Sequence, residues 1–546
     1  MTAALANRLW QAACAPAERA FRRALADPEA AQTAVLHAHV RTCAATEIGR
    51  RTGLGRVRTL ADFRARVPLA TWEDLAPDAE RIAQGAAGVW TPGRPERLEP
   101  TSGTAGGTKL VPHTAAMRSQ VRAAIGAWMA DLFQAYPDLR DGPAYWSVSP
   151  AVPLPPARAG GPPVGFDGDA DALSPVHAHL ARAALAVPDA LRHALDPDAH
   201  RTATLRALVA RTGLRLVSVW NPTALSLLLA PLRADAERLA EDLARGTLTA
   251  DVPEAVRAAV LRGVRPDPRR AHALRAAARE TADAGALVAR LWPRLGLVSA
   301  WADAHAAGPF AALGALAPQA TLQPKGLLAT EGVVSIPRVG HDGAALALTS
   351  HVVELLDGGR SVPLAQADVG GRFEVALTTG AGLLRYRLGD TVEVVGRLGR
   401  CPLVRFVGRA GLVSDRVGEK LAEAHVAACL ARLGLTFALV ACDEAARPPA
   451  YVLFAETAAP DAALARDAGR LDAALGANVH YAHARRLGQL GAVRAFRVRG
   501  SGAEQFVAGC VALGQRAGSV KPAALHRDGG WTARFSGGFV CGSMPA

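Results

Sequence analysis

A short run of threonine, serine and glycine between two strand-like segments constrains this chain more than any other feature. It reads Thr-Ser-Gly-Thr-Ala-Gly-Gly-Thr-Lys over residues 101–109, and strand-like residues precede it at 97–99 and follow it at 110–111. Small residues let the backbone approach a ligand closely, and successive backbone N–H groups in such a loop can converge on phosphate oxygens. The sequence therefore predicts either a phosphate-binding loop or an ordinary glycine-rich hairpin loop.

The polar side chains of this loop fit phosphate binding, although the pattern is not a Walker A motif. Thr101, Ser102 and Thr104 supply hydroxyl donors, and Lys109 supplies a positive charge. In a Walker A motif a Ser or Thr directly follows the lysine, whereas here Leu110 follows it. The predicted loop also lies between two strands rather than between a strand and a helix.

Three later segments carry further candidate residues. Glu331 follows an apolar run, where a carboxylate suits Mg²⁺ or caps the backbone. Asp390 ends the segment Tyr-Arg-Leu-Gly-Asp at 386–390, where a carboxylate after a glycine turn accepts two ribose hydroxyls or closes an ordinary Asp turn. Glycine and charge at 406–409 and 418–421 fit either a hinge or a plain linker.

Taken in this order, the four segments resemble the motifs of acyl-adenylate-forming enzymes. They are most similar to the Gretchen Hagen-type acyl-acid amido synthetases, also called the auxin-responsive promoter family. That family carries a Ser-Ser-Gly-Thr-Ser-type loop, then Tyr-x-x-Ser-Glu, then Tyr-Arg-x-Gly-Asp. The similarity extends through nearly the whole chain, with further matches at Phe63, Val67-Pro68, Glu73-Asp74-Leu75, Gln515 and Lys521-Pro522.

The resemblance implies a site for ATP and Mg²⁺. The loop residues that would hold the ATP phosphates are Thr101, Ser102, Gly103, Thr104, Gly106 and Lys109. Glu331 would bind Mg²⁺, and Thr330 would lie near the adenylate. Asp390 would bind the ribose hydroxyls, and Tyr386 would support that segment.

The resemblance also implies a small C-terminal domain that rotates between two reaction steps. Arg409 and Lys420 fall in the stretch that resembles the inter-domain hinge. Lys521 matches the C-terminal lysine that enters the site and stabilises adenylation. The chain departs from the family pattern at Leu327, where the family has the tyrosine of Tyr-x-x-Ser-Glu, and at Ala105, which replaces a hydroxyl residue. An aromatic face for adenine is therefore missing at position 327.

The expected fold is mixed α/β. Helical periodicity dominates up to about residue 90 and again at 180–300, Thr114 starts a further helix, and residues 140–170 indicate a surface loop. Short strands follow at about 320–408, among them 346–356, 373–378, 383–387 and 392–395, with a turn at 380–382. A hairpin is expected at 437–454. We expect a large adenylate-forming domain over residues 1–407, with a β-barrel and α/β layers, and a small mobile α+β domain over residues 408–546.

The expected function is an ATP-dependent acyl-acid amido synthetase. It would activate a carboxylic acid as an acyl-AMP and transfer the acyl group to an amine or amino acid. Two alternatives stay open: a ligase with a thiol acceptor such as coenzyme A, and a non-catalytic nucleotide-binding protein.

Composition bears on the partners and the compartment. The net charge is +13, but the 62 Lys and Arg residues are spread along the chain without a basic block, which argues against nucleic acid. Seven cysteines without a Cys-x-x-Cys pair indicate reduced thiols and a cytoplasmic location. The sequence contains no long uncharged apolar run, so no membrane helix is expected, and no signal peptide is expected either.

Only four of the basic residues are lysines, which makes each a candidate site residue: Lys109, Lys325, Lys420 and Lys521.

Overall fold

The chain divides into two compact units in the computed structural model. The structure describes residues 2–101, 109–151, 157–165, 175–409, 413–414, 416–515 and 517–540. The first unit comprises Met1–Asp303 with Gly308–Phe406, and the second comprises Ala304–Ala307 with Val407–Ala546. Whether the second unit moves as a separate domain stays a prediction.

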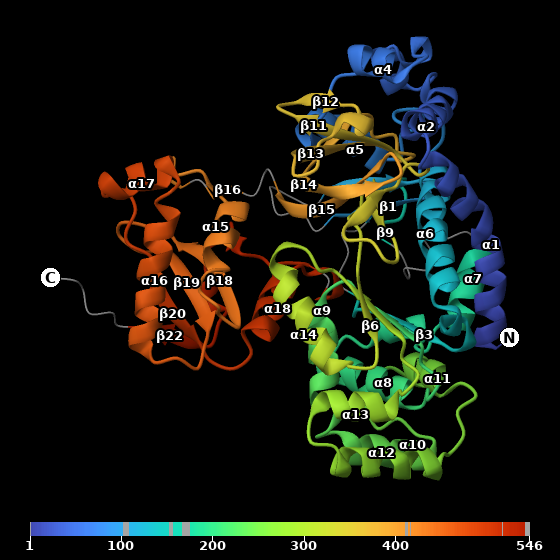
Figure 1. The fold of residues 1–546 in the computed structure, drawn as a ribbon, viewed down its shortest axis with the longest axis vertical. Coiled ribbons are helices and arrows are strands. Elements are labelled where there is room, and N and C mark those ends of the chain that lie inside the picture. Colours follow the sequence, from blue (N-terminus) through green and yellow to red (C-terminus); the bar gives the residue numbers. More distant parts are fainter. Residues whose placement is uncertain are drawn as a thin grey trace. The chain divides into compact units, whose positions relative to one another are not determined.

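Helices open the first unit, as helical periodicity predicted. They are α1 (Ala3–Ala24), α2 (Pro28–Cys43), α3 (Glu47–Arg51), α4 (Leu60–Arg66) and α5 (Trp72–Ala83). Side chains of Thr2, Asp27, Thr46 and Thr59 cap four of them by accepting hydrogen bonds from first-turn N–H groups that have no partner within the helix. Helix α1 packs along helix α6 (Ala115–Ala135), as Figure 1 shows.

The two strands that flank the predicted loop are present. Strands β1 (Arg97–Pro100) and β2 (Leu110–His113) pair antiparallel, with Pro100 opposite Leu110. Thr114 caps the N-terminus of α6 directly after β2. The loop therefore connects two strands of one hairpin and does not lead into a helix.

A four-stranded parallel sheet forms the α/β layer of this unit. Its order is β3 (Ala144–Trp146), β4 (Leu216–Ser218), β5 (Leu297–Ala300) and β6 (Thr321–Pro324). Strand β3 lies in the stretch predicted to be a surface loop. The helices in its crossovers are α7 (Pro175–Ala184), α8 (Pro197–Val209), α9 (Pro222–Leu229), α10 (Ala236–Arg245), α11 (Glu254–Leu261), α12 (Pro268–Glu280), α13 (Ala284–Leu291) and α14 (Ala307–Leu316). Helices α8 to α14 bury apolar side chains in one core with the sheet, whereas α7 packs against α1.

A seven-stranded sheet follows, and it is not confirmed as the expected barrel. Its order is β12-β11-β13-β14-β15-β10-β9, so that β12 and β9 are its edges among the described strands. The strands are β9 (Ser335–Pro337), β10 (Ala344–Leu346), β11 (Val352–Asp357), β12 (Arg360–Val362), β13 (Arg372–Thr378), β14 (Tyr386–Leu398) and β15 (Cys401–Arg409). The predicted strand at 346–356 is in fact divided between β10 and β11. A small hairpin, β7 (Leu328–Ala329) and β8 (Gly332–Val333), lies just before this sheet in the chain.

The second unit is built on a five-stranded mixed sheet in the order β21-β18-β19-β20-β22. The predicted hairpin at 437–454 is confirmed as β18 (Phe437–Asp443) and β19 (Ala450–Glu456). The other strands are β16 (Val413–Ser414), β17 (Leu421–Ala422), β20 (Arg494–Val498), β21 (Leu525–His526) and β22 (Gly537–Phe539). The helices are α15 (Glu423–Leu430), α16 (Asp461–Leu475), α17 (Val479–Arg486) and α18 (Gly502–Ala512). The fold is therefore mixed α/β, as expected.

Two further findings concern membrane-spanning helices and cysteines. In the part of the chain that the structure describes, no helix is both long and apolar enough to cross a bilayer. The six described cysteines are free and buried: Cys14, Cys43, Cys401, Cys429, Cys442 and Cys510.

Candidate adenylation site

The β1–β2 hairpin holds the two ends of the predicted phosphate loop together. The backbone N–H of Thr101 donates to the carbonyl of Lys109 at 2.9 Å. The hydroxyl of Thr101 is buried and has no hydrogen-bond partner among the described residues. A buried hydroxyl costs free energy unless it is hydrogen-bonded, so this one suits a ligand oxygen. The other predicted loop residues lie outside the described residues: Ser102, Gly103, Thr104 and Gly106.

Lys109 meets Tyr386 although the two residues are 277 positions apart in the chain. Its ammonium lies 3.4 Å from the Tyr386 hydroxyl and 5.7 Å from the centre of the Trp72 ring. Tyr386 is buried, and a short bridge to Ala70 holds it: Ala70 donates to the carbonyl of Arg385, and Arg387 donates to that of Ala70. The structure therefore brings together two of the residues that the motifs predicted.

Asp390 does not follow a turn, which corrects the sequence interpretation. Residues 386–390 run inside the single strand β14, where two shorter strands were expected. Gly389 has a positive φ of 75°, and the pairing of β13 with β14 shifts register nearby, so the segment contains a β-bulge. A positive φ strains residues that have a side chain, which explains the glycine. The Asp390 side chain is buried at 4% exposure.

Thr330 and Glu331 form the two-residue turn between β7 and β8. Glu331 is buried at 5% exposure. The next residue, Gly332, packs so closely that a Cβ there would lie 2.9 Å from Nε2 of His351. The close packing of His351 against position 332 leaves space only for glycine. It holds the backbone directly after Glu331, the predicted Mg²⁺ ligand. Leu327, which stands where the family has tyrosine, is fully buried.

A buried polar network behind this turn was missed from the sequence. The side-chain oxygen of Gln120 accepts from the N–H of Gly380 at 2.6 Å and from Nδ1 of His351 at 2.9 Å, and its amide nitrogen lies 3.0 Å from Nε2 of His39. Burial lowers the pKa of His39 to about 4 and that of His351 to about 3, so both rings are neutral at pH 7. The network ties α2, α6 and the 379–383 turn to the turn that carries Glu331.

The second missed feature is a buried ion pair beside Tyr386. Nε of Arg385 donates to Glu354 at 3.0 Å, and the side-chain exposures are 7% and 1%. The guanidinium also donates to the carbonyls of Arg64 and Val67 and to the Ser361 hydroxyl. Arg385 has a φ of 46°, a left-handed conformation that is uncommon outside glycine. These bonds hold that conformation and so fix the direction in which β14 begins.

The carboxyl ends of the parallel strands carry a third group of side chains. Ligands of open α/β sheets bind at this edge. Lys325, which follows β6, is buried and donates to the Ser218 hydroxyl at the end of β4 at 2.7 Å. Its ammonium lies 4.8 Å from the ring centre of Trp128 and 4.9 Å from that of Trp220. Of the four lysines singled out in the sequence, Lys325 is therefore the most enclosed.

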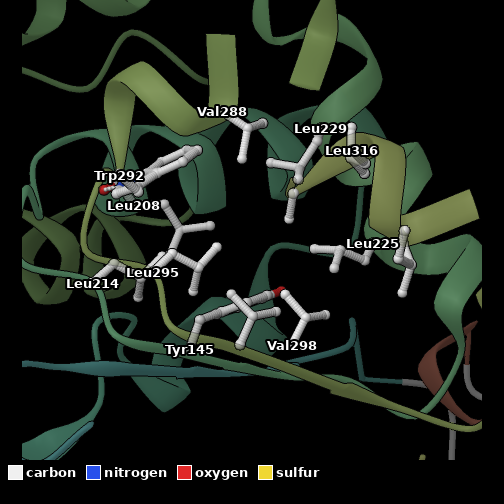
Figure 2. Close-up of a pocket in the computed structure, with 13 residues that line it drawn as sticks. Tyr145, Leu208, Leu214, Leu225, Leu229, Val288, Trp292, Leu295, Val298 and Leu316 are labelled. Carbon is white, nitrogen blue, oxygen red and sulfur yellow. Dashed lines mark hydrogen bonds between the residues drawn. The ribbon is translucent and has the colours of Figure 1, made fainter. Parts of the chain in front are cut away.

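Beneath this sheet lies a small apolar cavity, shown in Figure 2. Its volume is about 20 Å³, and its lining includes Tyr145, Leu225, Leu229, Trp292 and Val298. That volume holds about one water molecule, and such apolar cavities stay dry. The cavity is a packing defect of the core and has no evident part in catalysis.

The remaining predicted residues belong to the other end of the chain. Arg409 ends strand β15, and its side chain lies outside what is described. Lys420 is exposed with a φ of 44°, directly after Glu419, whose buried carboxylate accepts from the N–H groups of Arg416 and Val417. Lys521 is exposed in the second unit. Their roles in catalysis stay predictions.

The chain belongs to the GH3 family. The GH3 family N-terminal domain matches residues 17–320, more than half of the chain, and the GH3 family central domain matches residues 349–409. The human GH3 domain-containing protein is 34% identical over 244 residues, which are 42% of this chain and 41% of the human protein. The match thus spans less than half of that relative.

Other GH3 proteins are similar over more of the chain. The indole-3-acetic acid-amido synthetase GH3.8 of Oryza sativa subsp. indica is 26% identical over 437 residues, which cover 73% of this chain and 69% of the rice protein. The solved structure of the GH3.15 acyl acid amido synthetase superposes with a TM-score of 0.81 at 19% identity, covering 96% of this chain and 97% of that one. The fold described above is therefore the GH3 fold across both units.

Proposed function

We propose that this protein is an ATP-dependent acyl-acid amido synthetase. It activates a carboxylic acid as an acyl-adenylate, releasing pyrophosphate, and then transfers the acyl group to an amine or amino acid, releasing AMP. The observation that carries the proposal is the contact between Lys109, at the end of the loop, and Tyr386, at the start of the Tyr-Arg-x-Gly-Asp segment. The last residue of the loop proposed to bind phosphate thus lies beside the first residue of the segment proposed to bind ribose.

The residues that are described fit a nucleotide and a magnesium ion. The buried Thr101 hydroxyl is an open hydrogen-bonding group at the base of the loop. In the described part of the chain no cluster of three or more His, Cys, Asp or Glu residues could hold a metal ion. Mg²⁺ commonly takes only one or two protein carboxylates beside phosphate oxygens and water. Glu331 would be that carboxylate, and bound Mg²⁺ would neutralise charge on the phosphates.

The side chains of the first unit would act on the phosphates of bound ATP. When a carboxylate oxygen of the acid attacks the α-phosphorus, the bond to the pyrophosphate oxygen breaks and negative charge builds on the phosphoryl oxygens. Lys109 and the loop N–H and hydroxyl donors would stabilise that charge from fixed positions. Asp390 would hold the ribose hydroxyls, and the buried Tyr386 would hold Lys109 in place. Lys521 of the second unit would stabilise the adenylation step, and Arg409 and Lys420 would belong to the hinge segment.

In the second step the acceptor amine attacks the acyl carbon of the adenylate. The C–N bond forms, the bond from carbon to the AMP oxygen breaks, and the amine loses its proton to a base or to solvent.

Burial of the described cysteines as free thiols supports a reducing compartment, so we place the reaction in the cytoplasm.

The test is ATP–[³²P]pyrophosphate exchange with a panel of aromatic, fatty and small carboxylic acids. The panel includes indole-3-acetic acid and 2,4-DB, which appear in the names of similar proteins. We expect exchange that depends on both Mg²⁺ and one class of acid. A protein that binds ATP but supports no exchange with any acid would contradict adenylation.

The acceptor is identified separately, by mass spectrometry of the products with amino acids, simple amines and coenzyme A. An amide product together with AMP is expected. A thioester formed with coenzyme A, and no amide, would assign the chain to the thiol-acceptor alternative.

A further inference from the structure

A cleft lined by arginines lies in the first unit, and none of its residues is a predicted nucleotide contact. Its volume is about 360 Å³, and it is lined by Arg64, Leu69, Gly359, Arg360, Ser361 and Arg385. These residues come from three places: the segment of α4 and its C-terminal loop, the β11–β12 hairpin, and the start of β14. Small-molecule sites typically have volumes of about 300–1,000 Å³.

The cleft carries more positive charge than the protein neutralises. Three guanidinium groups line it, and two of them are paired with one carboxylate, the buried Glu354, which accepts from Arg385 at 3.0 Å and from Arg64 at 3.4 Å. Asp357 is opposite Arg360 in the β11–β12 register, but no ion pair joins them among the described residues. Three positive guanidinium groups face one negative carboxylate, so the cleft carries an excess of positive charge.

The three arginines differ in how many donors they still offer. Arg385 is committed inward, because its donors go to Glu354, Ser361 and two backbone carbonyls. Arg64 uses Nε on Glu354, and within the described part of the chain its two terminal amino groups have no protein acceptor. Arg360 is exposed, and its side chain makes no hydrogen bond or ion pair with described residues. The guanidinium groups of Arg64 and Arg360 therefore both have donors left for a ligand in the cleft.

Guanidinium forks match the oxygens of phosphate in a bidentate manner, and hydrogen bonds between charged groups are the stronger ones. Leu69 adds an apolar wall beside the two forks. We propose that this cleft binds the phosphate group of a phosphorylated small molecule, held by Arg64 and Arg360, at a site other than the adenylation site.

The test uses inorganic phosphate as the probe and the full-length protein. Isothermal titration calorimetry is run on the unaltered protein and on Lys109→Ala, which removes the charge that would hold phosphate in the adenylation site. We expect both proteins to bind phosphate in the cleft with the same affinity. Loss of phosphate binding in Lys109→Ala, or no phosphate binding in either protein, would overturn the proposal.

Two variants and a matched control locate the bound phosphate. Arg360→Gln and Arg64→Gln should each weaken phosphate binding by about tenfold, the loss expected for a charge-assisted hydrogen bond. Arg66→Gln removes the same charge from an exposed residue of α4 that does not line the cleft, and it should leave the affinity unchanged. Equal weakening in all three variants would indicate a general charge effect and overturn the proposal.

A last titration tests the kind of anion. Malonate, a dicarboxylate, should bind more weakly than phosphate, and tighter binding of malonate would overturn the assignment to phosphate. Arg360→Gln is expected to fold, because Arg360 is exposed and its side chain makes no hydrogen bond or ion pair with described residues. The pyrophosphate exchange assay is independent of this site, so failure of the cleft and failure of the proposed function give different results.

Discussion

Glu354→Gln tests whether the Arg385 ion pair holds the start of β14 in place. The carboxylate is 1% exposed and accepts three hydrogen bonds, from Arg385, Arg64 and Ser361. Glutamine keeps one acceptor oxygen but removes the charge, so the buried guanidinium of Arg385 loses its counter-ion. Breaking a buried ion pair by removing one partner costs about 3–5 kcal/mol. Because one acceptor remains, we expect a loss of about 3 kcal/mol in the free energy of unfolding.

The same sheet offers a matched control. Arg372 and Glu393 form a pair with the same 3.0 Å separation between Nε and the carboxylate oxygen, but the side chains are 64% and 31% exposed. Exposed pairs contribute about 0–1 kcal/mol, so Glu393→Gln should change stability by no more than that. The substitution, the residue types and the distance match, so the comparison contrasts a buried carboxylate with three partners with an exposed carboxylate paired to one arginine.

The assay is urea unfolding followed by tryptophan fluorescence. Eight of the nine tryptophans lie before residue 304 and only Trp531 lies in the second unit, so the signal reports the first unit. Equal effects of Glu354→Gln and Glu393→Gln, or a loss below about 1 kcal/mol in Glu354→Gln, would refute the reasoning about the buried pair.

Three further predictions concern the site and the network behind it. Lys109→Ala should slow ATP–pyrophosphate exchange by about 10²–10³-fold, as loss of one fixed transition-state donor does, and an unchanged rate would remove Lys109 from the mechanism. Glu331→Gln should shift the Mg²⁺ dependence of exchange to higher concentration, and an unaltered Mg²⁺ titration would contradict its role as a ligand. Burial lowers the pKa of His39 to about 4 and of His351 to about 3, so the unfolded chain binds more protons below pH 6.5. The free energy of unfolding should therefore fall as pH drops from about 6.5 towards 4, by about 1.4 kcal/mol per pH unit for each such histidine. Unfolding curves measured at pH 7.5 and 5 check this: His39→Gln should reduce the pH dependence of the free energy of unfolding, and an unchanged pH dependence would contradict the reasoning.

Local features of the first unit could be predicted because neighbouring residues determine them. The β1 and β2 strands, the Thr114 cap of α6 and the turn at 380–382 all follow from residues within a few positions. The same holds for the β18–β19 hairpin. The Gly389 bulge was missed because Gly-Asp is also a common turn sequence, and only pairing with β13 keeps the strand continuous.

The sequence by itself determined the family motifs and their order, because each motif is a short segment whose residue types carry the chemistry. It could not place Arg385, Glu354, Gln120, His39 and His351, which look like ordinary surface residues until they are buried. These side chains come from segments up to several hundred residues apart and become partners only after the helices and the seven-stranded sheet have packed. Tertiary structure decided them because burial turns a polar side chain from a solvated group into one that must find a partner.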